Sequence, residues 1–501
     1  MHALHDAPPS AISQALAKER LGVMRVLFFV GSCIGPLLVT AGLIPSAFAA
    51  TGLTGEPAAL LVVGLVLCVF TIGYSTYAKY IPNAGALYAM IAQGLGRPAG
   101  VGAAFVALVA YNMLQVGIYG MFGPTMASFA AANWNWHVAW WLWALALWAI
   151  VGLLGLRRVD INSVVLGVFS LVEIALVLTL AIRGVMHPAA GGLHAGSLSP
   201  LSLRGAGFGP LVAIAVLAFT GFEQTAVYSE EARNIRRTIP HATYIALIGI
   251  GVVYTLASFA MTVHYGSATV AVAQSQGSEM LFALGSGLLT STGHTLFLTS
   301  LFAAALGFHN ACWRYSFSLG REGVLPSLLA RTGRANIPRW SSGLQSLIGF
   351  GAIVLTGIEH WDPTTRLFYW MGTTGGFGVL LLLAATSFAV IRYFLVTTNP
   401  EAQQEPRAKW LFAPAIAGVA LCIMIILCAQ QYALLLGVAP NSPAAIVLPA
   451  LFSVGLLGAV WAMVLKRRFP ETYRVIGLGP ESTLHRSGSP IPITSIQESA
   501  S

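Results

Sequence analysis

Long apolar stretches alternate along the chain with short segments that carry the charges. Charged residues are absent from positions 26–55, 57–78, 98–156, 238–278 and 410–465. Because a helix needs about 20 apolar residues to cross the hydrocarbon core of a bilayer, each of the two longest stretches holds two spans and each of the others holds one. With hydropathy along the rest of the chain, twelve membrane-spanning helices are predicted, at 26–48, 58–78, 98–124, 138–157, 162–184, 207–228, 239–264, 292–316, 342–358, 366–392, 410–433 and 444–465.

The basic residues indicate how these spans are oriented. If the N-terminus lies in the cytoplasm, only Arg183, Arg204 and Arg366 of the 26 Lys and Arg residues fall in outer segments. Cytoplasmic loops carry an excess of basic residues, so both termini are expected inside the cell. The expected organisation is a cytoplasmic segment 1–25, spans 1 to 5 in 26–200, spans 6 to 10 in 201–396, spans 11 and 12 in 397–468, and a disordered cytoplasmic tail 469–501.

The composition agrees with an all-α polytopic membrane protein. Only 9% of the residues are charged and the mean hydropathy is +0.77, whereas soluble domains carry roughly 25% charged residues. The asymmetry of the basic residues accounts for the net charge of +9, so the expected partner is the lipid bilayer and not nucleic acid. The five cysteines fall within predicted spans and are interpreted as small hydrophobic residues, not as a disulfide framework.

Three classes of membrane protein fit twelve spans: a secondary transporter, a redox enzyme with cofactors between its helices, and a channel or sensor. Of eleven histidines only His309 lies well inside a predicted span, so a haem core would lack ligands, and no cofactor or metal is expected. No repeated filter sequence indicates a channel. A transporter predicts Gly-interrupted spans at matching positions of two halves, because broken helices form its substrate site.

Two predicted spans are interrupted in this way. Span 1 carries Gly31, Gly35 and Pro36 near its middle, and Gly221 and Glu223 interrupt the apolar run of span 6. Glycine and proline favour local unwinding, which frees backbone amides and carbonyls to bind a ligand. A single glycine in a membrane helix usually serves packing, but two matched clusters, one with a carboxylate, favour a binding site.

At these positions the chain resembles the amino acid–polyamine–organocation (APC) permeases. Residues 219–240, Phe-Thr-Gly-Phe-Glu-Gln-Thr-Ala-Val-Tyr-Ser-Glu-Glu-Ala-Arg-Asn-Ile-Arg-Arg-Thr-Ile-Pro, are similar to the family's span-6 signature. Two further motifs match in the expected order, Pro-Asn-Ala-Gly-Ala-Leu-Tyr at 82–88 and Gly-Arg-Glu-Gly-Val-Leu-Pro at 320–326. The resemblance implies a permease and not an enzyme. It also implies a five-plus-five inverted repeat of the LeuT/APC type with two additional helices, working by alternating access.

The resemblance further implies a substrate site at mid-membrane between spans 1 and 6. The implied substrate-binding residues are Gly31, Ser32, Cys33, Ile34 and Gly35 of span 1 and Phe219, Thr220, Gly221 and Phe222 of span 6. In such permeases the second half of span 1 points its N-terminus at a substrate carboxylate. Pro36 lacks an amide proton and removes one donor, and a similar proline occurs in the family's polyamine-importing branch. The expected substrate is an amino acid or an amine, in that order, with import and exchange both open.

Glu173 and Glu223 are the carboxylates placed deep inside predicted spans. A charged group there costs roughly 3 kcal/mol or more, so each is protonated, paired or functional. Because burial favours the neutral form of a carboxyl, we expect Glu173 or Glu223 to take up a coupling proton. Glu223 could instead be a structural acceptor that joins span 6 to its neighbours. Sodium, with the hydroxyls of Thr299 and Ser300 as ligands, is the less favoured coupling ion.

Two further groups of polar residues are candidates for function. Asn112 and Gln115 lie on one face of span 3, where they either line the pocket or join helices. The loop after span 6 and the end of span 8 are expected to form a cytoplasmic gate that is shut by pairing of opposite charges. Its predicted residues are Glu230, Glu231, Arg233, Arg237 and Arg314.

Overall fold

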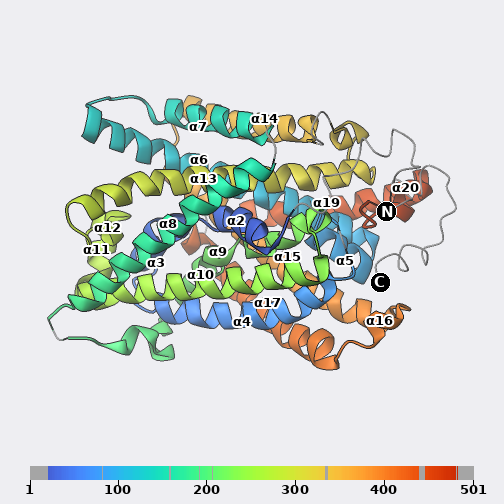
Figure 1. Ribbon diagram of the computed structural model, residues 1–501, viewed down its shortest axis with the longest axis horizontal. Helices are drawn as coiled ribbons and strands as arrows, with labels where there is room; N and C mark the ends of the chain where they lie inside the picture. Colours follow the sequence, from blue (N-terminus) through green and yellow to red (C-terminus); the bar gives the residue numbers. More distant parts are fainter. Residues whose placement is uncertain are drawn as a thin grey trace.

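The chain folds into helices connected by short loops (Figure 1). The computed structural model describes residues 21–81, 83–156, 159–190, 192–205, 207–332, 337–438, 446–480 and 482, with the backbone alone at 159–166. Over these residues the extended backbone pairs only at an isolated bridge between Leu21 and Ala232. The expected N-terminal segment up to residue 20 and the tail from 483 onward lie outside the described residues.

Eleven helical stretches of the described chain are long and apolar enough to cross a membrane. They are Val23–Thr51, Glu56–Ala78, Arg97–Trp134, Gly167–Met186, Phe208–Glu231, Ile235–Gln276, Leu288–Arg321, Arg339–Ile358, Thr364–Val396, Ala408–Gln430 and Val447–Arg468. The fourth predicted span is helix α7 (Trp140–Gly155), which is apolar but has only 16 residues. A polytopic all-helical membrane protein is therefore confirmed, with eleven long helices and a shorter one where twelve spans were predicted.

Several of these stretches are built from more than one helical segment. The named segments used below are α2 (Val23–Ile34), η2 (Leu38–Leu43), α3 (Ile44–Thr51), α4 (Glu56–Ala78), α6 (Arg97–Trp134), α8 (Val159–Met186), α9 (Phe208–Phe219), η5 (Phe222–Glu231), α10 (Ile235–Tyr265), α13 (Leu288–Arg321), α14 (Arg339–Ile358), η9 (Thr364–Met371), α15 (Gly372–Val396), α17 (Ala413–Gln430) and α19 (Val447–Arg468). Short helices between them are α5 (Leu87–Leu95), α11 (Thr269–Gln276), α12 (Glu279–Phe282), α16 (Pro400–Gln403) and α20 (Pro470–Val475).

Helix α6 differs from its prediction, which ended span 3 at residue 124. The helix continues through Pro124 to Trp134, because neighbouring helices in a membrane bundle can satisfy the backbone group that a proline frees. Its C-terminal end exposes Trp134, and Trp136 follows in the loop. Exposed tryptophans of this kind are typical of the membrane–water interface.

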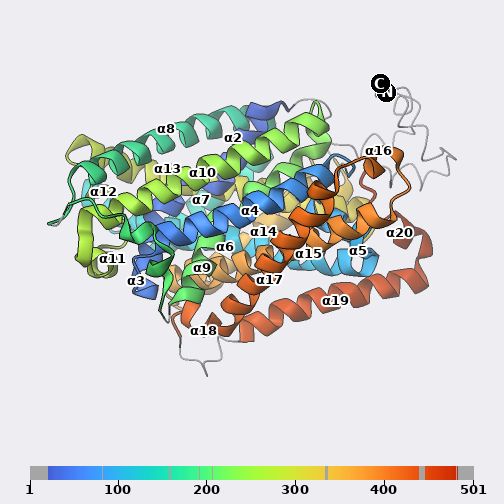
Figure 2. The ribbon, with the colours of Figure 1, turned by 90° about the horizontal axis from the view of Figure 1, so that it is seen from below.

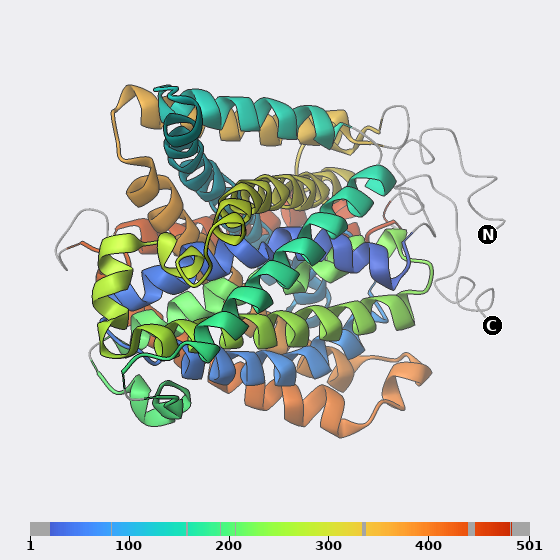
Figure 3. The same cartoon turned by 60° about the vertical axis from the view of Figure 1, so that its left-hand side comes forward.

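The two interrupted stretches lie in the middle of the bundle. Helix α2 packs against α8, α10 and α13, and η5 packs against α2, α10 and α13. The labels of α2 and α9 fall at the centre of the view in Figure 1, and Figure 3 shows α2 crossed by neighbouring helices on several sides. Large side chains on outer helices, such as Leu153 and Leu456, are exposed, as expected for surfaces that face lipid.

The short helices mark the two ends of the bundle. In Figures 1 and 2, α5, α16 and α20 gather at one end, while α11 and α12 lie at the other. We call the first the basic end, because it holds many of the basic residues that the sequence predicts to be cytoplasmic, among them Lys79, Arg236 and Arg321. Helix α20 and the residues after it belong to the tail expected to be disordered, so the ordered chain extends further than predicted.

Candidate functional site

The first interrupted stretch breaks at Gly35. Helix α2 ends there, and Gly35 adopts a left-handed conformation with φ of 55° while its amide donates to the Gly31 carbonyl. A residue with a Cβ is strained in that conformation, which explains the glycine. The helix resumes at once, since the amide of Val39 donates to the carbonyl of Gly35 at 3.0 Å. Span 1 therefore consists of two half-helices joined at one residue.

The second interrupted stretch breaks at Gly221. Helix α9 ends at Phe219, Thr220 is extended, and Gly221 has φ of 120°. The chain then continues as the 3₁₀ helix η5 over ten residues, a length at which this tighter helix is uncommon and often marks a functional segment. The sequence prediction of an interruption in both spans agrees with these two breaks.

The two breaks face one another. A Cβ built on Gly221 would lie 3.3 Å from the backbone nitrogen of Ile34 and 3.4 Å from the carbonyl carbon of Cys33. The Cys33 thiol donates to the side-chain carbonyl of Gln224 at 3.1 Å, which ties α2 directly to η5. Tyr254 of α10 donates its hydroxyl to the Ile34 carbonyl at 3.2 Å. The backbones of the two breaks therefore meet at van der Waals distance.

A cavity of about 40 Å³ lies beside this meeting point. Its walls come from α2, η2, α6, α9, α13 and η9, and include Cys33, Ile34, Thr220 and Phe308. Its lining consists of apolar residues, glycines, a cysteine and a threonine, and none of these lining residues carries a charge. Small-molecule sites are typically apolar hollows with a few placed polar groups, and the two breaks supply such groups here.

Glu223 holds the second break together. One carboxylate oxygen accepts the Gly221 amide at 2.8 Å, and the other accepts the Tyr111 hydroxyl of α6 at 2.9 Å. Its backbone carbonyl accepts the Tyr74 hydroxyl of α4 at 2.6 Å. Both oxygens of this buried carboxylate thus have partners from the break and from a neighbouring helix.

Glu173 on α8 contacts the first break instead. Its Oε2 accepts the Leu37 amide at 3.4 Å, and the Ser300 hydroxyl of α13 accepts the next amide, that of Leu38, at 3.3 Å. Glu173 is 1% exposed, and its Oε1 has no hydrogen-bond partner among the described residues. A buried carboxyl oxygen without a partner is costly.

The remaining predicted binding residues occupy the same region without all reaching the cavity. Gly31 lies within α2, and the Ser32 hydroxyl donates to the Phe29 carbonyl of its own helix at 2.6 Å. Phe219 packs against Tyr254, and Phe222 packs edge-on against Phe70. These contacts pack Phe219 and Phe222, which flank the break at Gly221, against α10 and α4.

Asn112 and Gln115 lie outside the cavity lining. Asn112 donates to the Leu108 carbonyl of its own helix. Gln115 contacts Tyr119, His309 of α13 and Gln345 of α14, and His309 in turn contacts Ser342 of α14 at 2.9 Å. The cavity instead contacts the face of α6 that carries Leu114 and Gly117. Gln115 therefore joins α6 to α13 and α14, whereas the hydrogen bond that Asn112 donates stays within α6.

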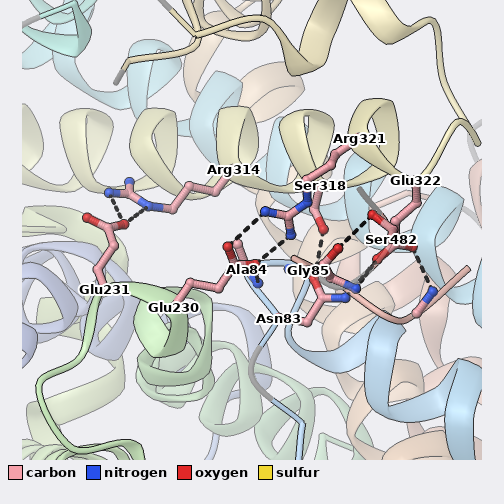
Figure 4. Close-up of polar contacts among 12 residues, drawn as sticks. Asn83, Ala84, Gly85, Glu230, Glu231, Arg314, Ser318, Arg321, Glu322 and Ser482 are labelled. Atoms are coloured by element: carbon pink, nitrogen blue, oxygen red, sulfur yellow. Dashed lines mark hydrogen bonds and ion pairs between the residues drawn. The ribbon is translucent and has the colours of Figure 1, made fainter. Parts of the chain in front are cut away.

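At the basic end, two buried ion pairs connect η5 to α13 (Figure 4). Arg314 donates through Nε and Nη2 to Glu231 at 3.0 and 2.9 Å, and its side chain is 0% exposed. Arg321 donates to both oxygens of Glu230 at 2.9 and 2.6 Å. Glu230 also accepts the Ala84 amide at 2.7 Å. The predicted pairing of a loop acid with Arg314 is thus present, and Arg321 forms a second pair of the same kind.

A second polar cluster, for whose residues no role was predicted, lies next to these pairs. Asn83 donates to Glu322 at 2.9 Å and accepts the Ser318 hydroxyl at 2.7 Å. Glu322 also accepts the amides of Gly477 and Gly479, at 2.7 and 2.8 Å. Figure 4 shows Asn83, Glu322 and Ser482 grouped beside the Arg321 pair. The chain after α20 therefore reaches the contact between the loop at 83–85 and α13.

Burial raises the pKa of the Glu322 carboxyl, and the hydrogen bonds from Gly477, Tyr88 and Gly479 act in the opposite direction. Asn83 and Glu322 both lie in motifs recognised in the sequence, at 82–88 and 320–326. The sequence therefore contained a signal for these residues but did not indicate their role.

Two arginines of the predicted gate do not take part in these pairs. Arg233 and Arg237 are exposed and form no ion pair with any described residue. The neighbouring Arg236 pairs with Glu401 at 2.5 Å.

The sequence of the chain matches a known protein family. A family model described as "Amino acid permease" matches residues 21–459. The low-affinity putrescine importer PlaP of Escherichia coli (strain K12) is 25% identical over 370 residues, which cover 70% of this chain and 76% of that protein. An uncharacterized transporter of Mycobacterium bovis is 27% identical over 366 residues, covering 65% and 72%.

A more distant relative is the histidine permease of Saccharomyces cerevisiae, 23% identical over 296 residues, which cover 53% of this chain and 47% of that protein. The family match spans all eleven long helices except the last residues of α19. It therefore includes both breaks, the cavity and the ion pairs at the basic end. The chain belongs to the amino acid permease family of the APC superfamily, a family of membrane transporters and not an enzyme class.

Proposed function

We propose that this protein is a secondary active transporter that moves amino acids or related amines across the cytoplasmic membrane by alternating access. The observation that carries the proposal is the pair of breaks, at Gly35 and Gly221, which meet beside an apolar cavity. Broken helices at mid-membrane are how transporters of this kind bind substrate. The relatives named for putrescine and histidine support a small amine or amino acid as the transported molecule.

The two halves of the chain support an inverted repeat. Each half begins with an interrupted stretch, Val23–Thr51 in the first and Phe208–Glu231 in the second. In transporters built from such repeats, the first helices of both halves form the substrate site, and one group of helices rocks against the other. Residues 26–200 and 201–396 would be the two repeats here, followed by the two additional helices α17 and α19.

The ion pairs of Glu230 and Glu231 form the gate in this proposal. If the basic end faces the cytoplasm, as the distribution of Lys and Arg favours, these pairs hold the cytoplasmic side shut. Opening toward the cytoplasm then requires η5 and α13 to separate, with rupture of both pairs. Of the gate residues predicted from sequence, Glu230, Glu231 and Arg314 carry the closure, together with Arg321.

Proton coupling is assigned to Glu173 in preference to Glu223. Glu223 has a partner on each oxygen, which fits a structural acceptor. Glu173 binds the Leu37 amide through Oε2 and leaves Oε1 without a partner among the described residues. A proton on Oε1 neutralises the carboxyl while Oε2 keeps its hydrogen bond, so both protonation states fit the break.

Uptake into proteoliposomes tests transport and coupling together. We expect radiolabelled substrate to accumulate in response to a pH gradient and not to a sodium gradient. In Glu173→Gln the pH dependence should be lost, because the amide carries no titratable proton, whereas Glu223→Gln should retain it. Unchanged pH dependence in Glu173→Gln would remove this residue from the coupling mechanism, and the absence of uptake of every amino acid and amine would reject the transporter itself.

A further inference from the structure

The second half of span 1 has no amide left for a substrate carboxylate. Three residues precede the first hydrogen bond of this half-helix, whose N-terminal amides would otherwise form an anion site. Pro36 has no amide proton, the Leu37 amide is bound by Glu173, and the Leu38 amide is bound by Ser300. Protein side chains therefore occupy the position at which a half-helix N-terminus would bind an anion.

The amide at the other break is also occupied. The Gly221 amide donates to the Glu223 carboxylate at 2.8 Å, and the amide of Gln224 donates to the Gly221 carbonyl at 3.1 Å. Both facing breaks thus present their amides to glutamates of this chain. A substrate carboxylate at either place would meet a carboxylate as its neighbour.

Hydrogen-bond acceptors, by contrast, are left over at the first break. In a continuous helix the carbonyls of Ser32 and Cys33 would accept the amides of residues 36 and 37. Residue 36 is proline, and the amide of Leu37 is directed to Glu173. Cys33 is part of the cavity wall and Ser32 is not, so the Cys33 carbonyl is the acceptor assigned to an ammonium group in the cavity.

Charges around the breaks favour a cation as well. The buried acids Glu173 and Glu223 contact the two breaks directly, while the buried Arg314 is paired with Glu231. None of the residues lining the cavity carries a charge. A carboxylate moved into this apolar hollow would lose its hydration without gaining a donor, whereas an ammonium on an alkyl chain would find acceptors and an apolar wall.

We infer that the site binds an aliphatic amine that lacks a carboxylate, and that Glu173 and Ser300 select against α-amino acids by occupying the amides of Leu37 and Leu38. This inference rests on the proposed transport function and names its substrate class. Glu173 acts here as a specificity residue through Oε2, which is separate from the proton assigned to Oε1. A carboxamide oxygen could accept the Leu37 amide equally well.

Matched pairs of compounds that differ only in the carboxylate test the inference. Counterflow of radiolabelled putrescine is measured in proteoliposomes in the presence of increasing concentrations of a competitor. One pair of competitors is unlabelled putrescine and ornithine, and the other is cadaverine and lysine. We expect each amine to compete at a concentration at least about tenfold lower than its amino acid, since a charge-assisted hydrogen bond is worth roughly that factor. Equal competition, or preference for the amino acids, would overturn the inference.

Variants locate the selectivity. Glu173→Ala frees the amide of Leu37, and addition of Ser300→Ala also frees the amide of Leu38. The preference for amine over amino acid, measured as the ratio of their competing concentrations, should fall by about tenfold. Glu173→Gln is the matched control and should keep the ratio, because its carbonyl oxygen still accepts the Leu37 amide. A ratio unchanged in Glu173→Ala contradicts the assignment to Glu173.

The competition in unmodified protein stands even where a variant does not fold. No counterflow of any compound would reject the transporter, whereas counterflow that favours amino acids would reject only the amine specificity.

Discussion

Arg314 is a charge buried within the protein, and its surroundings show why it is tolerated. It donates twice to Glu231 and once to the Asn310 carbonyl, and its guanidinium lies 4.2 Å from the ring of Trp313 and 4.5 Å from that of Tyr228. A buried ion pair adds little net stability, but loss of one partner leaves an uncompensated charge and is strongly destabilising. In the proposed gate, the pair therefore makes closure sensitive to a single residue.

Replacement of Glu231 by glutamine should change the rate of transport more than the affinity for substrate added from outside. The variant removes the negative charge beside Arg314 and should destabilise the contact proposed to close the cytoplasmic side by about 3 kcal/mol, while Glu231 does not line the cavity. Initial rates of uptake over a range of substrate concentrations separate the two effects.

Glu471→Gln provides the matched control for that measurement. Glu471 pairs with Arg474 at 3.0 Å, but the two side chains are 80% and 72% exposed. Exposed pairs contribute little, so this variant should transport like the parent. Equal changes in rate and in half-saturating concentration for Glu231→Gln would contradict a gate.

At the scale of elements, each break depends on a glycine for two separate reasons. Gly35 and Gly221 have positive φ, of 55° and 120°, which disfavours a side chain. Close approach adds to this, because the Cβ of a larger residue at Gly221 would press on Ile34 at 3.3 Å. Substitution would force α2 and η5 apart at the place where their freed backbones meet.

Gly221→Ala is therefore expected to destabilise the protein by about 1–3 kcal/mol and to reduce transport strongly. Gly249→Ala is the control. Gly249 is an exposed residue of α10, and outside the backbone of that helix an alanine Cβ there would meet no atom within 4 Å. Alanine at this position also favours the helix.

Thermal unfolding in detergent and counterflow measure the effects of these two substitutions on stability and on transport. A Gly221→Ala protein as stable and active as Gly249→Ala would show that the break needs no glycine.

For the molecule as a whole, α20 and the chain after it connect distant parts of the basic end. Glu322 of the α13 end binds the Gly477 and Gly479 amides, Gln93 of α5 donates to the Gly477 carbonyl at 2.8 Å, and Arg97 donates to the Arg474 carbonyl at 2.7 Å. Through Asn83 the same cluster reaches the loop that contacts Glu230. The C-terminal segment thus adds contacts that stabilise the arrangement of the basic end.

Removal of the Glu322 carboxylate should release this segment. Ile476 is 2% exposed, so a cysteine introduced there reports release through its rate of thiol labelling in detergent. We expect Glu322→Ala to speed labelling of Ile476→Cys at least about tenfold, since it removes the acceptor of two amide hydrogen bonds. Labelling of Cys68 and Cys422, which are partly buried, is subtracted with protein that lacks Ile476→Cys.

Glu471→Ala on α20 is the control for that experiment, because its exposed carboxylate makes no contact with the segment after Val475 in the described structure. It should leave labelling unchanged. Gly477→Pro removes the donor of one of these hydrogen bonds and also cannot keep the φ of 84° at this position, so it should act in the same direction as Glu322→Ala. Slow labelling in both variants would mean that the segment is held by other contacts.

The sequence by itself determined the class of the protein, the helices and the places where two of them break. Apolar length and charge are local properties, and glycine and proline act on their own backbone, so the spans and the interruptions at Gly35 and Gly221 could be predicted. The shortness of α7, the continuation of α6 through Pro124 and the ordered α20 could not, because neighbouring helices decide where a helix ends and whether a tail docks.

Only the tertiary structure decided which groups the breaks bind. Glu173 lies more than a hundred positions after Leu37, and Ser300 lies further still, so no spacing in the sequence shows that they occupy the amides of one half-helix. The same holds for Gln115, which contacts α13 and α14 and not the cavity, and for Glu322, which binds the end of the chain. Hydrogen bonds between helices depend on how the helices pack, and packing brings together residues that the sequence keeps apart.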